Sequence, residues 1–214
     1  MIGRRAIPIV ASALLAGGCQ TVATTPTAAK AADQRPTDWR SVVSDADRKR
    51  IGGWRTAWVA ALRAARAAGH GEDLAARAAL FDPDGALPNP YIPPGDYRCR
   101  TTKLGAKWAG LLDYVAYGWF TCRIAAEQDI FSFTKLSGSQ RPIGLLFDDS
   151  DRRQVFLGTL QLGDERGIID YGVDTDRDMA GVVERIGAER WRLVLPYPAF
   201  ESLLDVIEIA PPAD

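Results

Sequence analysis

The chain has 214 residues, which is enough for one domain with a substantial core and too few for two large domains. Hydrophobic residues make up 47% of the chain and charged residues 25%, as in ordinary globular proteins. The formal net charge of −1 provides no basic field for a nucleic acid, so we expect no nucleic-acid partner.

The N-terminal segment has the features of an export signal. Arg4 and Arg5 precede an apolar run over residues 6–16, which is too short to span a bilayer. The Leu-Ala-Gly-Gly sequence before Cys19 resembles the lipobox of bacterial lipoproteins. That resemblance implies that residues 1–18 are removed as a signal peptide and that Cys19 is acylated. An ordinary signal peptide with an incidental cysteine remains an alternative.

The same resemblance implies a location. Gln20 rather than Asp follows the cysteine, and in lipoprotein systems this implies transport to the outer membrane. We therefore expect a cell-envelope protein, anchored in the membrane by its N-terminal lipid and facing the periplasm. Residues 19–36 are rich in Thr, Ala and Pro without an apolar period, which predicts a flexible tether. We expect one folded domain over residues 37–212.

Residues 37–95 are predicted to be a helical segment with a proline-rich connector. Ser44 is a suitable N-cap for a helix over residues 45–68, which Gly69 would end. A second helix is predicted over residues 72–80. The first helix carries an apolar stripe with helical spacing, which indicates a face buried against a sheet rather than an exposed ligand platform. The stripe consists of Ile51, Trp54, Trp58, Ala61, Leu62 and Ala65.

His70, the only histidine, lies between two glycines near the predicted end of a helix. A general base needs an orienting partner and a nucleophile nearby, and the sequence offers neither beside His70. We expect no catalytic role for it.

Residues 96–212 contain short apolar, aromatic and β-branched runs that Gly, Asp and Pro separate every ten or so residues. This pattern predicts a small antiparallel barrel or sandwich of about eight strands, and the fold class is therefore α+β. Strands are expected near residues 97–102, 114–117, 121–125, 130–136, 143–147, 155–162, 179–185, 191–195 and 203–209.

Cys99 and Cys122 are the two cysteines that remain if Cys19 carries lipid. Exported compartments are oxidising, so an even pair predicts a disulfide. A catalytic cysteine is the rival interpretation, but it would need a histidine nearby, and the only histidine lies far upstream.

Asp174, Asp176 and Asp178 alternate as calcium ligands do in loops that curl around the ion. An EF-hand would then need Gly at Met179 and Glu at Arg185, so that motif is absent. A looser calcium site and a polar turn both stay open, and we favour the turn. We expect no other metal and no cofactor.

Two groups of basic and polar residues are candidates for a binding surface. The first lies beside the predicted disulfide, and its alternative is a solvated outer face. The second surrounds Gly138 and could hold a carboxylate or phosphate, although we favour a simple turn between strands. The candidate residues are Arg98, Arg100 and Arg123 in the first group, and Lys135, Ser139, Gln140 and Arg141 in the second.

The motifs of nucleotide binding, serine hydrolases and zinc proteases are absent from the sequence. We therefore expect a non-catalytic protein that binds an envelope protein or a small ligand. The alternative is a hydrolase that acts on cell-wall or polysaccharide substrates through paired carboxylates, which meet in space rather than in sequence. Glu165, Glu184 and Glu201 are available for that chemistry.

Several segments together resemble a bacterial family known as domain of unknown function 4893. The likeness extends over residues 38–211, supports a single domain in the cell envelope, and transfers no catalytic residue. A weaker likeness to lipocalin-type and periplasmic inhibitor barrels concerns the fold alone. The segments that carry the family resemblance are Asp38-Trp39-Arg40, Pro94-Gly95-Asp96-Tyr97-Arg98-Cys99-Arg100, Phe120-Thr121-Cys122-Arg123, Gly138-Ser139-Gln140-Arg141, Val155-Phe156-Leu157-Gly158-Thr159 and Tyr171-Gly172.

Overall fold

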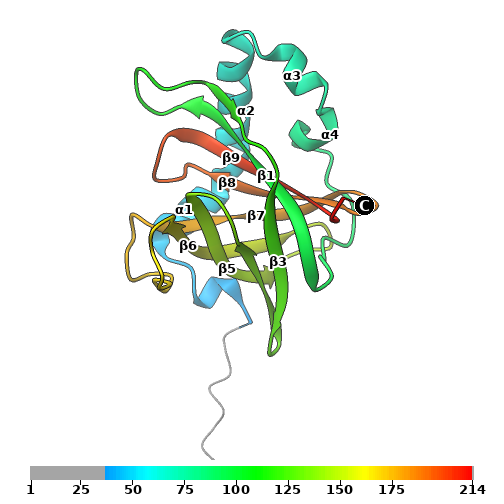
Figure 1. Cartoon of the computed structure of the whole chain (residues 1–214), viewed down its shortest axis with the longest axis vertical. Helices are drawn as coiled ribbons and strands as arrows, with labels where there is room; N and C mark the ends of the chain where they lie inside the picture. The colour runs from blue at the N-terminus through cyan, green and yellow to red at the C-terminus, as the bar shows by residue number, and fades with distance from the viewer. Residues whose placement is uncertain (1–36, 214) are drawn as a thin grey trace, which may run out of the picture. The chain divides into compact units, whose positions relative to one another are not determined.

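Helices occupy the N-terminal part of the described chain and strands the rest (Figure 1). The structure is a computed structural model that describes residues 37–213. The predictions for Cys19, the signal peptide (1–18) and the tether (19–36) therefore lie outside the described residues. The helices are the 3-10 helix η1 (Trp39–Ser41) and the α-helices α1 (Asp45–Gly52), α2 (Trp54–Ala67), α3 (Gly71–Ala75) and α4 (Ala78–Phe81).

The helix predicted over residues 45–68 is in fact two helices. Ser44 caps α1 as expected, because its hydroxyl accepts a hydrogen bond from an amide of the first turn. The helix ends at Gly52 and α2 begins at Trp54, with the backbone of Gly53 outside the helical region between them (φ −88°, ψ 4°). Glycine is a poor helix former, so two consecutive glycines divide the helix that the apolar spacing predicted.

The helix predicted over residues 72–80 is also divided, into α3 and α4. The backbone leaves the helical region at Arg77 (φ −125°, ψ 41°). The Arg77 guanidinium donates to the Tyr114 hydroxyl at 2.6 Å and lies 5.0 Å from the centre of the Phe81 ring. These tertiary contacts accompany the break in the helix. They cannot be predicted from the local spacing of apolar residues.

The apolar stripe of α2 packs against the sheet, as predicted. Trp58 at its centre is fully buried, and its indole nitrogen donates to the carbonyl of Phe81 at 3.1 Å. Trp54 is only partly buried, at the edge of this face, where the Arg153 guanidinium lies 4.1 Å from its ring centre. The face meets β1, β8 and β9.

Nine antiparallel strands form the β region, and each predicted strand has its counterpart. They are β1 (Gly95–Ala106), β2 (Tyr114–Ala116), β3 (Phe120–Glu127), β4 (Ile130–Lys135), β5 (Gln140–Asp148), β6 (Gln154–Leu162), β7 (Asp178–Gly187), β8 (Arg190–Pro196) and β9 (Ser202–Ala210).

The sheet closes into a barrel because β9 pairs with β1, and the α+β fold class is confirmed. The long strand β1 uses both of its edges. One edge pairs with β9 from Arg98 to Ala106. The other pairs with β3 over residues 95–99 and, further along, with β2 over residues 102–104, so β2 is an extra strand outside the closed ring.

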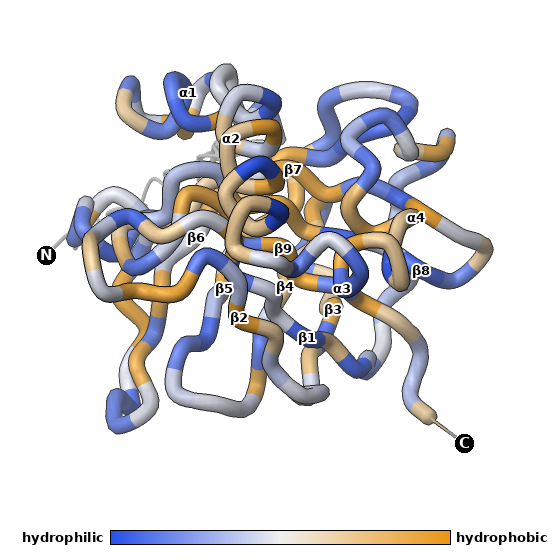
Figure 2. The backbone as a smooth tube through the Cα atoms, turned by 90° about the horizontal axis from the view of Figure 1, so that it is seen from above, coloured by the Kyte–Doolittle hydropathy of each residue, from blue (hydrophilic) through white to orange (hydrophobic). Residues whose placement is uncertain are grey.

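Alternate residues of the strands face two separate apolar cores. One core joins the outer face of the barrel to the helices, with Trp58 and Val206 among its members. The other contains no helix residue and fills the barrel interior, and it includes Tyr97 and Cys99, which share a face as predicted. Figure 2 shows the apolar residues concentrated along the strands. None of the helices within residues 37–213 is long and apolar enough to span a membrane.

Candidate functional site

Large side chains fill the barrel interior. The rings of Phe133 and Phe156 meet edge to face with their centres 6.0 Å apart, and those of Tyr97 and Trp191 do so at 5.9 Å. The interior cluster also holds the Cys99–Cys122 disulfide, which confirms the predicted pairing and links β1 to β3. A barrel filled in this way has no room for a ligand of ordinary size.

Charged residues occupy one end of the interior. Lys103 on β1 pairs with Asp205 at 2.9 Å and with Glu201 at 3.1 Å. Burial disfavours the charge of Lys103, but the two carboxylates outweigh that effect and raise its pKa. A cavity of about 30 Å³ adjoins this pair, and Asp178 from β7 also lines it. This volume suits a water molecule rather than a substrate.

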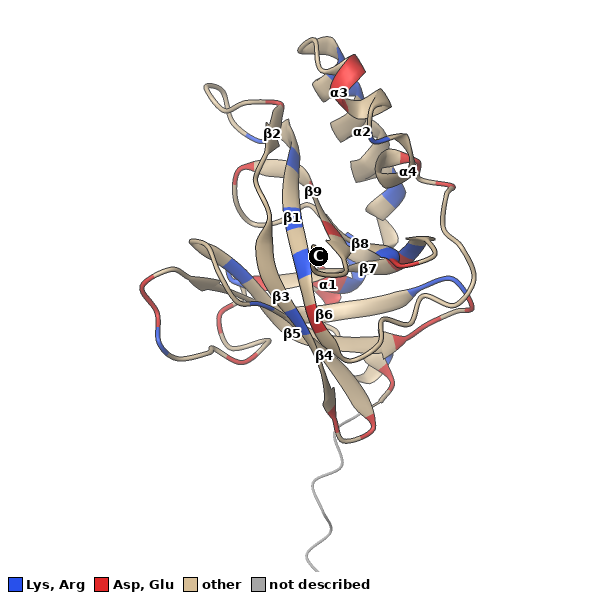
Figure 3. Ribbon diagram, turned by 45° about the vertical axis from the view of Figure 1, so that its right-hand side comes forward, with Lys and Arg blue, Asp and Glu red and all other residues tan. Residues whose placement is uncertain are grey.

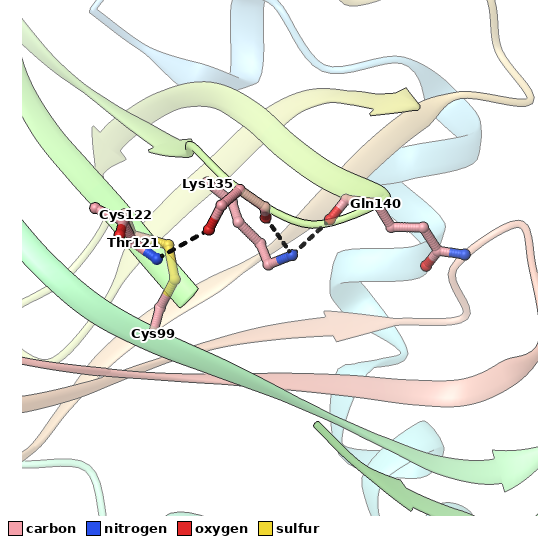
Figure 4. Close-up of a disulfide and its surroundings, with 6 residues drawn as sticks. Cys99, Thr121, Cys122, Lys135 and Gln140 are labelled. Carbon is pink, nitrogen blue, oxygen red and sulfur yellow. Dashed lines mark hydrogen bonds between the residues drawn. A yellow bond between two sulfur atoms is a disulfide. The ribbon is translucent and has the colours of Figure 1, made fainter. Parts of the chain in front are cut away.

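Lys135 is a buried residue and not part of a surface, so its assignment to a surface group was wrong. Its ammonium donates to the carbonyls of Ser137 and Gln140, both at 2.9 Å, and lies 3.8 Å from the centre of the Phe120 ring. Figure 4 shows this side chain beside the disulfide, directed at the carbonyl of Gln140. Burial lowers its pKa to about 8, with smaller contributions from the positive charges of Arg141 and Lys103.

The turn around Gly138 does not gather free cations. Arg141 donates to the carbonyls of Gly138 and Leu162, among others, so its guanidinium serves the fold. The Gln140 side chain lines the small cavity at the barrel end, and Ser139 is exposed on the turn. The anion site that the sequence suggested here is therefore not assembled.

The three alternating aspartates do not converge. Asp174 accepts a hydrogen bond from the amide of Asp176, and Asp178 accepts one from the amide of Gly172. Burial raises the pKa of Asp178. Among residues 37–213, no group of three acidic, His or Cys side chains lies close enough to hold a metal ion. The segment is a polar turn in which carboxylates cap amides, the interpretation that we favoured over a calcium site.

The arginines beside the disulfide divide into two kinds. Arg123 pairs with Asp96 at 2.6 Å in an exposed ion pair. Arg98 and Arg100, in contrast, both stack on Trp119, with their guanidinium carbons 4.6 and 4.4 Å from its ring centre. Figure 3 shows several basic residues one after another along β1.

Arg98 differs from its neighbour in having no polar partner within the described chain. Arg100 donates to Glu208 at 2.7 Å, which neutralises its charge. The Nε of Arg98 is buried without a hydrogen-bond partner, and the guanidinium forms no ion pair with any described residue. A guanidinium in this state is suited to bind a carboxylate or another anion from outside the domain.

The segment that carries Trp119 projects from the barrel, and we call residues 107–119 the arm. It consists of the loop after β1, β2 and the approach to β3, and it extends beyond the closed ring (Figure 1). Its apolar side chains are unusually exposed: 62% for Trp108 and 71% for Leu112. The other exposed members are Leu111, Tyr117 and Trp119.

Our sequence reasoning missed the arm as a site. The signal was the concentration of two tryptophans, two tyrosines and two leucines between residues 107 and 120. Such a cluster usually indicates core, and only the strand pairing shows that this one lies outside the barrel.

A groove of about 350 Å³ lies on the outer wall of β4, β5 and β6 beneath residues 168–171. This volume is at the lower end of the range for small-molecule sites. Two of its polar side chains are already engaged, because Ser132 donates to Glu127 and Tyr171 donates to Asp47. The arm, whose Trp119 lies against the unpaired guanidinium of Arg98, is therefore the stronger candidate.

His70 lies at the N-cap of α3, where its Nδ1 is 2.8 Å from a carboxylate oxygen of Asp73. Its ring stacks on Tyr114 with the centres 4.5 Å apart. These contacts connect α3 to β2.

Comparison with known proteins identified a family match. The model of a family described as a domain of unknown function, DUF4893, matches residues 39–209. No curated protein and no solved structure matches the chain.

Proposed function

The chain belongs to the DUF4893 family, as its sequence suggested, and from its geometry we propose that it is a non-catalytic, lipid-anchored binding protein of the cell envelope. The arm is its binding surface, and the partner is another envelope protein. The observation that carries this proposal is the exposure of Trp108 and Leu112 in the arm, whose Trp119 lies against the unpaired Arg98. Aromatic, leucine and arginine side chains exposed together are typical of interaction sites.

The filled barrel supports the same proposal. A lipocalin-type carrier needs an open interior, whereas here aromatic residues occupy the space that a ligand would need. The Cys99–Cys122 disulfide is typical of an oxidising compartment, and it fits a periplasmic location. Acylation of Cys19 would then hold the domain on the outer membrane, which faces the same compartment.

A carboxylate-dependent hydrolase is the second candidate, because Asp178 and Asp205 come from different strands and line the same cavity. Burial raises the pKa of both carboxyl groups. A cavity of about 30 Å³, however, cannot admit a sugar ring, and Asp205 already pairs with Lys103. The geometry therefore favours binding over hydrolysis.

Site-specific photo-cross-linking in intact cells tests the proposal. A benzophenone amino acid would replace Trp108 in the arm or Val59, an exposed apolar residue on α2 that serves as the control. We expect a discrete protein adduct from position 108 and none from position 59. Equal adducts from both positions would contradict the proposal, as would the release of reducing sugar or muropeptides by the purified protein.

The anchor is tested separately with Cys19→Ser. We expect the native protein to sediment with outer membranes and to have a mass that includes acyl chains. The variant should lose that mass and move to the soluble fraction. A native protein of unmodified peptide mass would refute the anchor and leave the binding surface to its own test.

A further inference from the structure

The outer edge of β2 is free. In an antiparallel ladder, residues that exchange hydrogen bonds alternate with residues whose amide and carbonyl point the other way. The amide of Tyr117 donates to Thr101, and the amide of Gly105 donates to Asp113. The N–H and C=O groups of Tyr114 and Ala116 therefore point away from β1, and β2 has no second neighbour within the described sheet.

The barrel leaves this edge open because β4 is too short to cover it. The pairing of β3 with β4 ends where Cys122 meets Lys135, and the chain then turns back through residues 136–139. Beyond that turn, no described strand continues alongside β2. Unpaired backbone groups on a strand edge are a template for another strand.

We infer that the β2 edge binds an extended segment of the partner protein, which adds to the sheet as a further strand and carries a carboxylate for Arg98. This inference rests on the proposed function and specifies how its partner is recognised. Backbone pairing supplies affinity in such complexes, and side chains on alternate positions supply selectivity. The exposed Trp108, Leu112 and Trp119 lie in the segments that flank β2, and they offer apolar contacts for those side chains.

The charge of Arg98 determines the kind of segment. Arg98 lies four positions along β1 from Thr102, the residue opposite Ala116. Because a strand rises roughly 3.4 Å per residue, a segment of about six to eight residues spans this interval and reaches both features. An acidic residue near one end of it would satisfy the guanidinium.

The position of Arg98 favours a separate partner over a second copy of this chain. Two β2 strands paired antiparallel would place the two Arg98 side chains at opposite ends of the contact, so the pairing of copies gains no charge complementarity from them. The described chain also begins, at residue 37, at the end of the domain opposite the arm (Figures 1 and 3).

Selection from a displayed library of random ten-residue peptides, with the full-length protein as bait, tests the inference. We expect enriched peptides that are β-prone and contain Asp or Glu. On addition of such a peptide, the amides of Tyr114 and Ala116 should exchange hydrogen at least tenfold more slowly. Protection confined to other elements would overturn the inference.

Variants of the edge provide the sharper comparison. Ala116→Pro removes an outward N–H without removing a bond to β1, and should weaken peptide binding at least tenfold. Ala116→Thr keeps the N–H and should bind within twofold of the native protein. Arg98→Gln should weaken acidic peptides about fivefold and leave their Lys-substituted counterparts unchanged. Equal binding by all three variants would overturn the inference.

Peptide N-methylation tests the edge without altering the protein. Methyl groups on the amides that face β2 should abolish binding, and methyl groups on the alternate amides should not. Binding that tolerates both patterns would refute strand addition even if Ala116→Pro disturbs the arm.

Two other occupants of the edge would show themselves in different results. If the protein is in a monomer–dimer equilibrium that Ala116→Pro abolishes, the occupant is a second copy of the chain rather than a partner segment. If vesicles of phosphatidylethanolamine and phosphatidylglycerol bind to the protein and peptides do not, the occupant of the edge is a lipid surface rather than a protein segment.

The two proposals can fail separately. If the cross-link from position 108 persists in Ala116→Pro cells, the binding function stands and strand addition fails. If library peptides bind through the edge but position 108 gives no adduct in cells, the edge survives and the cellular function fails.

Discussion

Arg192 and Glu184 form an ion pair with both side chains fully buried between the barrel and the helices. The Arg192 guanidinium bonds Glu184 at 2.6 Å and donates to the carbonyls of Leu80 and Asp82, at the end of α4. It also lies 4.5 Å from the ring centre of Trp58. One residue thus joins a strand, a helix end and the tryptophan face, so its removal should affect all three.

Arg192→Met should lower the free energy of unfolding by about 3 kcal/mol, because it leaves a buried carboxylate with one partner fewer. Urea denaturation measures the loss. Arg55→Gln is the matched control, since its pair with Asp84 is exposed and should contribute little. The idea fails if the two variants lose similar amounts of stability.

Lys135 should make stability depend on alkaline pH. Burial lowers its pKa to about 8 in the folded protein, against 10.5 for the free side chain. Between these values the unfolded chain binds more protons, so stability rises with pH across that window. A shift of this size corresponds to about 3 kcal/mol.

Comparison with Lys135→Met isolates this contribution, because the other titrating groups are common to both proteins. The stability of the native protein relative to the variant should increase from pH 7.5 to pH 10, as measured by urea unfolding at both values. A constant difference would mean that the Lys135 pKa is not lowered.

At the scale of elements, β1 is the most connected strand. It pairs with β9, β3 and β2, contacts α2 and carries one end of the disulfide. Its pairing with β9 joins residues about a hundred positions apart in the sequence, such as Thr102 and Val206. The disulfide fastens the other edge of the same strand, where the pairing with β3 is short.

The double variant Cys99→Ala/Cys122→Ala should have a free energy of unfolding about 3 kcal/mol lower than that of the oxidised protein, since the disulfide closes a loop in the unfolded chain. Denaturation with and without reductant provides the internal control. Reductant should destabilise the native protein by the same amount and leave the variant unchanged. Two free thiols in the unreduced exported protein would refute the pairing.

A close approach of β5 and β6 also belongs to this scale. Gly144 and Gly158 face each other in the register, and a Cβ on either would overlap backbone atoms of the opposite strand. The ring of Phe156 occupies the neighbouring space inside the barrel. Glycine is therefore required at both positions for the strands to come together.

The whole molecule is a filled barrel with helices on one outer wall and a projecting arm. A carrier needs an open interior, whereas a binding or structural protein can have a filled one. The interior of this barrel therefore contributes to stability and is not a binding site. Phe133 is fully buried in that interior and is the natural place to test this distinction.

Phe133→Ala should lower the free energy of unfolding by about 3–5 kcal/mol and leave an apolar cavity. Such cavities bind benzene or xenon, so the variant should gain stability when benzene is added. The native protein should show no such gain. If benzene stabilises both proteins equally, the native interior is not filled.

The sequence by itself determined the local features of this protein. Apolar and β-branched runs separated by Gly, Asp and Pro located all nine strands, Gly69 ended a helix at the predicted position, and the pairing of Cys99 with Cys122 followed from their being the two cysteines other than Cys19. Each of these depends on nearby residues or on a small set of choices, which is why pattern alone was sufficient. The breaks at Gly53 and Arg77 were missed because apolar spacing continues across them.

Only the tertiary structure decided which residues are free to bind. Two arginines of the same pattern along β1 differ in this respect. Glu208 on β9 neutralises Arg100, whereas Arg98 has no hydrogen-bond or ion-pair partner in the described chain. Lys135 appeared to be a surface residue until barrel closure enclosed it. Closure depends on β1 meeting β9, and the free edge of β2 depends on where β4 stops. Both are contacts between distant segments, so no local period in the sequence records them.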